Sequence, residues 1–199
     1  MSSVRASVER RTVVALAASL GGLRAVSAII GALPRGFGAS TIIVLHLSEG
    51  GRGLLPAILA SHTALRVIEP TGGERLRAGW VYTAAPGRHL LVGRQRRLQV
   101  SDAAQVNNSR PSADPLFESL AAQPDLRAIA VILTGRDGDG SRGVPAISAG
   151  GGVVIVQDPE TAECGEMPQS AIDTGVVDYV LPLADIGPKL IELVNQKDA

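Results

Sequence analysis

Three side chains that could together perform nucleophilic catalysis each lie at or after the end of an apolar, strand-like run. Ser19 and His46 each end an apolar run typical of a buried strand, and Asp139 lies in a glycine-rich loop after a third such run. A histidine can take the proton of a serine hydroxyl, and a carboxylate can orient that histidine. Functional groups in a parallel sheet gather at the carboxyl ends of its strands. We therefore expect the three side chains to meet at one edge of a sheet.

Ser19 stands in the segment Ala17-Ala18-Ser19-Leu20-Gly21-Gly22, whose small residues permit a tight turn from strand to helix. The free N–H groups at the start of that helix would favour an oxyanion. The Gly-x-Ser-x-Gly form of a nucleophile elbow is absent. Taken alone, a serine here is more typical of a helix cap, and a lone histidine at a strand end is usually structural. We also interpret His62 and His89 as structural.

The loop that carries Asp139 has a rival interpretation. Gly138-x-Gly140-x-x-Gly143 follows a strand and has Asp158 twenty residues beyond its first glycine, which is the pattern of a dinucleotide-binding fingerprint. That fingerprint normally opens the first strand–helix–strand unit of a domain, whereas this one comes late. A dinucleotide-binding module therefore remains an alternative function at this point.

The elements that must position these residues alternate between strand and helix. The expected strands are Thr12–Ala18, Thr41–His46, Ala128–Thr134 and Val153–Gln157. The expected helices are Leu23–Leu33, Leu54–Ser61, Pro115–Ala122 with Asp114 as N-cap, and Ile186–Val194. Short strands at Trp80–Ala84, Leu90–Gly93 and Leu98–Val100 suggest antiparallel hairpins. The fold class is thus α/β, doubly wound, with a mainly parallel sheet, helices on both faces and an antiparallel hairpin region near residues 80–100.

Composition limits the other possibilities. The 199 residues are 45% hydrophobic, which excludes disorder, and the single cysteine, Cys164, excludes a disulfide framework or a multi-thiolate metal site. The net charge is zero, so no overall field attracts nucleic acid. Residues 1–100 nevertheless hold 13 arginines against 4 acidic residues, whereas residues 101–199 hold 6 basic against 15 acidic residues. Such asymmetry indicates either a charged interaction face or two halves that attract within one fold.

The N-terminus has two interpretations. Arg10 and Arg11 precede a short apolar run, as in an export signal whose cleavage would remove Ser19. The favoured interpretation is a flexible arm over residues 1–11 followed by the first buried strand, with one domain over residues 12–199. No stretch is long and apolar enough to predict a membrane span.

Six segments resemble, in order, the catalytic domain of chemotaxis receptor methylesterases of the CheB type. Ala18-Ser19-Leu20-Gly21-Gly22 is similar to the family's nucleophile turn, Val44-Leu45-His46-Leu47 to its histidine strand, and Leu133-Thr134-Gly135 with Asp139-Gly140 to its aspartate loop. The other three are Ala85–Leu90, Arg110–Ser119 and the stretch from Gln157-Asp158 through Met167-Pro168 to Ala171-Ile172. The resemblance extends from about Thr12 to Leu190.

The resemblance implies a protein-glutamate methylesterase, a carboxylic-ester hydrolase of the cytoplasm that releases methanol and also deamidates certain receptor glutamines. It makes Ser19 the nucleophile, His46 the general base and then acid, and Asp139 the orienting carboxylate. The implied partner is the cytoplasmic helix region of a methyl-accepting chemoreceptor. No cofactor, metal, nucleic acid or membrane insertion is implied.

The sequence departs from the family pattern at four positions. Leu20 replaces a frequent threonine, and Arg136, Asp137 and Gly138 replace the usual Met-Gly-Asn. Asp137 thereby becomes a competitor of Asp139, and a weakened homologue that acts as a regulatory docking protein is a further alternative. The response-regulator domain that usually precedes this domain is absent, so we expect a constitutively open enzyme, control by a separate response regulator, or a fragment.

Overall fold

The protein, described by a computed structural model over residues 10–46 and 53–196, is built around a parallel sheet. Its seven strands have the order β3-β4-β2-β1-β7-β8-β9, and all neighbours in it are parallel. The strands are β1 (Arg11–Ala18), β2 (Ser40–Leu45), β3 (Arg66–Ile68), β4 (Trp80–Thr83), β7 (Leu126–Ile132), β8 (Val153–Gln157) and β9 (Tyr179–Leu181). The central strands are apolar throughout because both faces of the sheet are covered.

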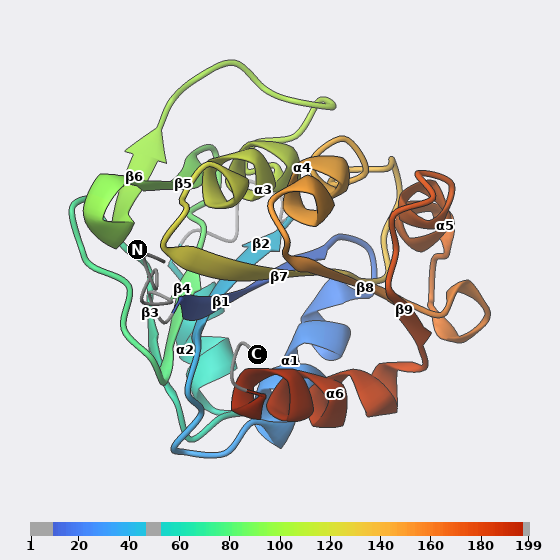
Figure 1. Ribbon diagram of the computed structural model, residues 1–199, viewed down its shortest axis with the longest axis horizontal. Helices are drawn as coiled ribbons and strands as arrows, with labels where there is room; N and C mark the ends of the chain where they lie inside the picture. Colours follow the sequence, from blue (N-terminus) through green and yellow to red (C-terminus); the bar gives the residue numbers. More distant parts are fainter. Residues whose placement is uncertain (1–9, 47–52, 197–199) are drawn as a thin grey trace, which may run out of the picture.

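Helices cover the two faces of the sheet in separate layers (Figure 1). One face carries α3 (Ala113–Ala121), α4 (Val144–Ala149) and α5 (Glu166–Ile172), and the other carries α1 (Gly22–Ala32), α2 (Leu55–Ala60) and α6 (Leu183–Asn195). Two short 3-10 helices, η2 (Arg94–Arg96) and η3 (Pro159–Thr161), lie in connections. Each layer packs its own apolar core against the sheet. The predicted α/β class with helices on both faces is confirmed.

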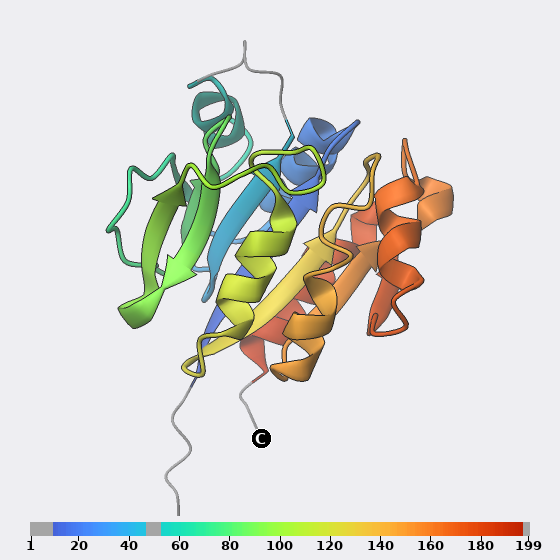
Figure 2. The same cartoon turned by 90° about the horizontal axis from the view of Figure 1, so that it is seen from above.

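A separate antiparallel pair, β5 (His89–Gly93) with β6 (Arg97–Ser101), lies beside α3 (Figure 2). Leu90, Val92 and Leu98 of this pair are buried in the core that α3 shares. The hairpin predicted near residues 80–100 is thus present, but Trp80–Ala84 is not part of it. That segment forms β4, which pairs with β2 and β3 in the parallel sheet. Its buried Val81 and Tyr82 pack on opposite faces of the sheet, as a sheet strand requires.

Several boundaries differ from those that the sequence predicts. Asp114 is not the N-cap of α3, because the helix begins at Ala113 and Ser112 precedes it with extended backbone. Helix α6 begins at Leu183 and runs through Pro188. The short elements β3, β9 and α5 were not predicted, because they have too few residues to show a periodic pattern.

The predicted arm at residues 1–11 lies largely outside the described residues, although Arg11 already belongs to β1. Among the described residues, every helix is too short or too polar to cross a membrane.

Close packing of α3 against the start of α4 depends on Gly143. A Cβ atom added there would lie 2.7 Å from Cβ of Phe117 and 3.1 Å from the carbonyl oxygen of Asp114. These neighbours are a buried aromatic side chain and helix backbone, neither of which can move away without disturbing the core. The glycine therefore fixes the distance between the two helices and the position of the loop before α4.

We expect Gly143→Ala to lower the free energy of unfolding by about 1–3 kcal/mol, because the added methyl overpacks this contact. Urea denaturation followed by circular dichroism measures the change. Gly36→Ala is the matched control, since a Cβ at Gly36 meets no atom within 4 Å. Equal stability of the two variants would contradict this account of the α3–α4 packing.

Candidate active site

The hydrogen bonding of the sheet places Ser19 and His46 side by side at its carboxyl edge. Central strand β1 pairs with β2 on one side and β7 on the other. The ladder continues beyond the strands, since the N–H of Ser19 donates to the carbonyl of Thr134 at 3.0 Å and the N–H of His46 donates to the carbonyl of Ala18 at 3.1 Å. These bonds fix the serine and the histidine on adjacent chains.

The turn after Ser19 is built for close approach. Gly21 has a left-handed backbone (φ 74°), and the side chain of Glu163 lies where a Cβ of Gly21 would project. At Gly22, a Cβ would lie 2.6 Å from both Ala18 and Leu45, so α1 begins very near the strand ends. Helix α1 has no side-chain cap and no acidic residue in its first turn. Its positive N-terminal end is therefore not neutralised by the helix itself.

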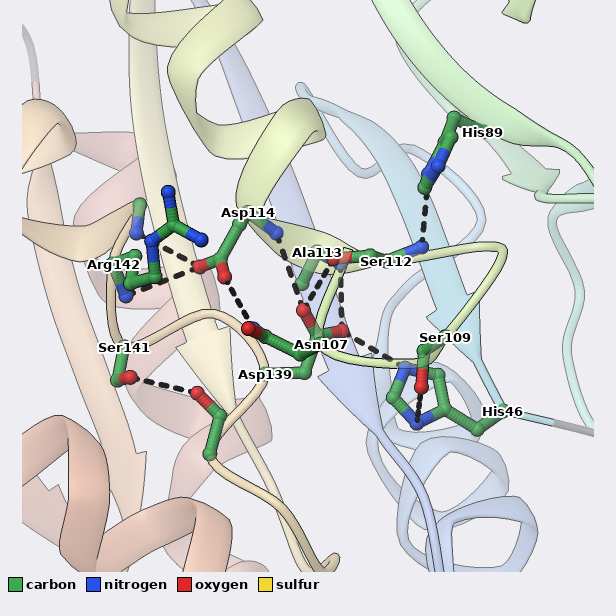
Figure 3. A network of polar contacts seen from close by, with 12 residues as sticks. His46, His89, Asn107, Ser109, Ser112, Ala113, Asp114, Asp139, Ser141 and Arg142 are labelled. Carbon is green, nitrogen blue, oxygen red and sulfur yellow. Dashed lines mark hydrogen bonds and ion pairs between the residues drawn. The ribbon is translucent and has the colours of Figure 1, made fainter. Parts of the chain in front are cut away.

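His46 forms a hydrogen-bonded pair with the carboxylate of Asp139 (Figure 3). Nε2 of the histidine lies 2.8 Å from Oδ2 of the aspartate, and the exposed fractions of the two side chains are 14% and 0%. An ionised carboxylate only accepts hydrogen bonds, so Nε2 carries the hydrogen of this bond. Nδ1 then carries the lone pair of the neutral ring and can accept a hydrogen bond. The Oγ of Ser109 lies 3.5 Å from that Nδ1.

Asp139 is held at the N-terminus of α3. Its Oδ1 accepts from the Ser112 hydroxyl at 2.5 Å, and its Oδ2 accepts from the backbone N–H of Ala113 at 2.7 Å. Burial by itself would raise the pKa of Asp139. The hydrogen bonds from His46, Ser112 and Ala113 outweigh burial and hold this pKa below its ordinary value. The site is therefore organised around an ionised, buried carboxylate.

His89 supports this arrangement from the hairpin. Its Nδ1 accepts from the backbone N–H of Ser112 at 3.2 Å, and its Nε2 lies 3.0 Å from the carbonyl oxygen of Ala104. The ring is 2% exposed and so links β5 to the segment that presents Ser112. The structural interpretation of His89 is in agreement with these contacts.

A second buried carboxylate, Asp114, fixes the loop that carries Asp139. It accepts from the N–H groups of Arg142 and Gly143 at 3.1 and 2.9 Å and from the side-chain amide of Asn107 at 2.7 Å. Burial raises the pKa of Asp114, and the nearby negative charge of Asp139 raises it further. Asp114 thus ties α3 to the far end of the aspartate loop.

Ser19 and His46 open into one hollow of about 880 Å³ at the strand ends. The serine is half-buried. Among the residues that the structure describes, no hydrogen bond joins the hydroxyl of Ser19 to the imidazole of His46. Such bonds are often long in unliganded enzymes and tighten when a substrate binds.

The departures in the aspartate loop lie away from the His46–Asp139 contact. Arg136 and Asp137 are exposed, and Asp137 has a left-handed backbone (φ 76°). The carboxylate that meets the histidine is that of Asp139. The sequence assigned no role to Ser109 or Ser112, and it predicted Asp114 only as the N-cap of a helix. The only signal for Ser112 was the family-like segment Arg110–Ser119, which shows similarity and not contacts and does not include Ser109.

Two glycines of the rival dinucleotide fingerprint, Gly140 and Gly143, pack closely against buried side chains. A Cβ at Gly140 would lie 2.5 Å from Ile132 and 3.1 Å from Phe117, so this side of the loop faces the core. Helix α4 has only six residues, and the carboxylate of Asp158 accepts from the N–H of Glu160 at 3.0 Å to cap η3. The dinucleotide interpretation is therefore not favoured. Within residues 10–46 and 53–196, no group of three His, Cys, Asp or Glu side chains is placed to hold a metal ion.

The fold and this site define an α/β protein whose serine, imidazole and carboxylate gather at the carboxyl edge of a parallel sheet. Comparison with known proteins identifies the family within this class, since residues 14–190 match the family model described as CheB methylesterase. The chain belongs to the CheB methylesterase family.

A solved structure supports this assignment. The chain resembles the crystal structure of the Thermotoga maritima CheB methylesterase catalytic domain with a TM-score of 0.86 and 36% identity, over 92% of this chain and 98% of the other.

Two relatives differ in how much of their length the chain matches. A Leptospira interrogans protein is 38% identical over 180 residues, which cover 90% of this chain and 93% of the relative. An Anaeromyxobacter dehalogenans protein, named protein-glutamate methylesterase/protein-glutamine glutaminase 2, is 40% identical over 190 residues. That match covers 96% of this chain but 55% of the relative, so this chain spans about half of the longer protein.

We expect Asp139→Asn to remove an acid-sensitive part of the stability. Because folding lowers the pKa of Asp139, the ionised carboxylate stabilises the fold above its unfolded pKa of about 3.9, and this stabilisation is lost as the pH falls through the lower folded pKa. The difference in free energy of unfolding between wild type and variant should be constant near neutral pH and shrink below about pH 4. Urea denaturation at several pH values measures it. A difference that grows towards acid pH would contradict the lowered pKa, and Asp137→Asn serves as the exposed control.

Proposed function

We propose that this protein is a serine hydrolase that removes methyl esters from glutamate side chains and releases methanol. The observation that supports this most directly is the buried Asp139–His46 pair beside Ser19, in a chain of the CheB methylesterase family. In this proposal Ser19 is the nucleophile, His46 the general base and then acid, and Asp139 the orienting carboxylate.

The proposed reaction begins when Nδ1 of His46 takes the proton of the Ser19 hydroxyl as its oxygen attacks the ester carbonyl. The tetrahedral intermediate collapses, the C–O bond to the methoxy group breaks, and the imidazolium returns the proton so that methanol leaves. Water then attacks the acyl-enzyme by the same steps and yields glutamate and free Ser19. Throughout, Asp139 holds Nε2–H and stabilises the transient imidazolium.

The start of α1 supplies a favourable place for the oxyanion. The backbone of Leu20 and Gly21 follows the nucleophile directly, at a helix end without its own cap. Backbone N–H donors aimed at a developing oxyanion are worth about a hundredfold or more in rate. The loss of a threonine hydroxyl at Leu20 leaves these backbone donors in place.

The same acyl chemistry would also deamidate a glutamine, with ammonia leaving in place of methanol. The Anaeromyxobacter relative is named for both activities. We propose that the protein substrate is a methyl-accepting chemoreceptor, approached in the cytoplasm. Control by a separate response regulator remains a prediction from the sequence.

We expect Ser19→Ala and His46→Ala each to reduce methanol release from a methylated receptor by at least about 10³-fold, because each removes one half of the proton-transfer pair. Gas chromatography of released methanol measures the rate, and circular dichroism checks the fold. Retention of most activity in either variant would rule out the proposed mechanism.

A second experiment tests the alternative that the protein is a weakened homologue acting as a regulatory docking protein. Detection of an acyl-enzyme on wild type with an active ester, and its loss in Ser19→Ala, would exclude that alternative.

The role of Asp139 as the orienting carboxylate can be tested against Asp137, the other aspartate of the same loop. We expect Asp139→Asn to lower kcat by on the order of 10³- to 10⁴-fold, because an amide no longer fixes the Nε2–H tautomer or stabilises imidazolium. Asp137→Asn should stay within about threefold of wild type, since its side chain is exposed and makes no bond to His46. Comparable losses in both variants would contradict the assignment of Asp139.

A further inference from the structure

The hollow at the proposed active site extends well beyond the reacting groups. From Ser19 and His46 it continues along the exposed side of α1 to Ile58 of α2 and to His62. We name this hollow the α1–α2 groove. Its lining residues are Ser19, Leu20, Gly21, Gly22, Leu23, Arg24, Ser27, Ala28, Leu45, His46, Ile58 and His62.

The volume of the groove is far larger than the reacting group needs. A glutamyl methyl ester has six heavy atoms beyond Cα, which occupy on the order of 180 Å³ if each takes about the 30 Å³ of a liquid water molecule. The groove has about 880 Å³. The groove therefore has room for parts of the substrate that do not react, and binding energy from such parts can support catalysis.

The walls of the groove are unusually apolar for an exposed surface. Leu20, Leu23 and Ile58 are 44%, 36% and 38% exposed and all line it. Only two other large hydrophobic side chains of the described residues are exposed, Leu54 and Val180. Leu54 directly precedes α2. Clustering of exposed apolar side chains around one hollow is typical of a binding surface.

One arginine is the charged side chain among the described lining residues of the groove. Among the described residues, its lining contains Arg24 and two histidines but neither aspartate nor glutamate. Arg24 is exposed and forms no ion pair within residues 10–46 and 53–196. An occupant that brings a carboxylate to this position would complement the guanidinium.

The shape of the walls favours a helix as the occupant. The groove presents side chains of α1 and α2, whereas β3 and β9, the outer strands of the sheet, contribute no lining residue. An extended peptide would find no strand edge here to satisfy its backbone N–H and C=O groups. A helix satisfies those groups internally and can offer an apolar stripe to the leucines.

We propose that the α1–α2 groove docks the helix that carries the glutamyl ester, an amphipathic helix with apolar side chains next to the ester and a carboxylate near Arg24. This inference rests on the proposed function and deepens it. Leu23 and Ile58 anchor the apolar stripe, and Arg24 pairs with the acidic side chain. The groove thereby determines which helices present their esters to Ser19.

The test compares a methylated receptor with 4-nitrophenyl acetate, a small ester that carries no helix to dock. We expect Leu23→Ser and Ile58→Ser each to raise KM for the receptor roughly tenfold with little change in kcat, because the lost contacts are remote from the reacting atoms. Hydrolysis of 4-nitrophenyl acetate should fall less than twofold. Arg24→Gln should raise KM at low ionic strength and flatten its dependence on salt.

Val180→Ser is the matched control, because Val180 is as exposed as these residues but does not line the groove. The proposal is overturned if KM for the receptor is unchanged in Leu23→Ser and Ile58→Ser, or rises equally in Val180→Ser. A dimer that dissociates in the groove variants without a change in KM would show that a second copy is the occupant, and would also overturn it. Absence of Ser19-dependent hydrolysis of 4-nitrophenyl acetate by wild type counts against the proposed function instead, so the two failures are distinguishable.

Discussion

The buried negative charge of Asp139 is the interaction on which the rest of the site depends. A carboxylate without exposed surface is costly unless donors surround it, and here a hydroxyl, a helix N-terminal N–H and an imidazole N–H provide them. Because these donors together lower its pKa, the group remains an acceptor near neutral pH. This fixes the hydrogen of His46 on Nε2, and in the proposed mechanism it leaves Nδ1 to act as the base. In the usual serine-protease arrangement the carboxylate binds Nδ1, so the proposed mechanism uses the two ring nitrogens in exchanged roles.

Much of the remaining structure serves to keep that carboxylate in place. Asp114 ties the loop after Asp139 to α3, and Gly143 lets α3 approach closely enough for the start of the helix to reach the carboxylate. His89 holds the backbone of Ser112 from the hairpin. The antiparallel pair, which is not part of the main sheet, therefore contributes to the geometry of the candidate site.

Two buried carboxylates lie close together in this region. Burial and the nearby charge of Asp139 raise the pKa of Asp114. One carboxylate is arranged to stay ionised, and the other supports the loop.

The sequence predicts the parts of this arrangement that depend on patterns among neighbouring residues. Continuous apolar runs predicted β1, β2, β7 and β8, and the strand ends then placed Ser19 and His46 at one edge. Asp139 was separated from Asp137 by resemblance alone, since spacing fits either residue. The contacts of Ser109, Ser112 and Asp114 could not be predicted, because they join segments far apart in the chain and leave no periodic pattern. Trp80–Ala84 was assigned to the hairpin because a four-residue strand followed by Pro-Gly looks the same in either sheet. The dinucleotide-like glycines show that a local motif can also mislead, because these glycines allow close packing in the core.

The most direct test of this account is the tautomer of His46, measured by ¹⁵N NMR on protein labelled in its histidine rings, with His46→Gln used to assign the signals. At a pH where the ring is neutral, the account predicts a protonated Nε2 and an unprotonated Nδ1, as the bond to ionised Asp139 requires. A ring with its hydrogen on Nδ1 would contradict the account, because Nε2 could not then donate to the carboxylate and Nδ1 could not accept the proton of Ser19.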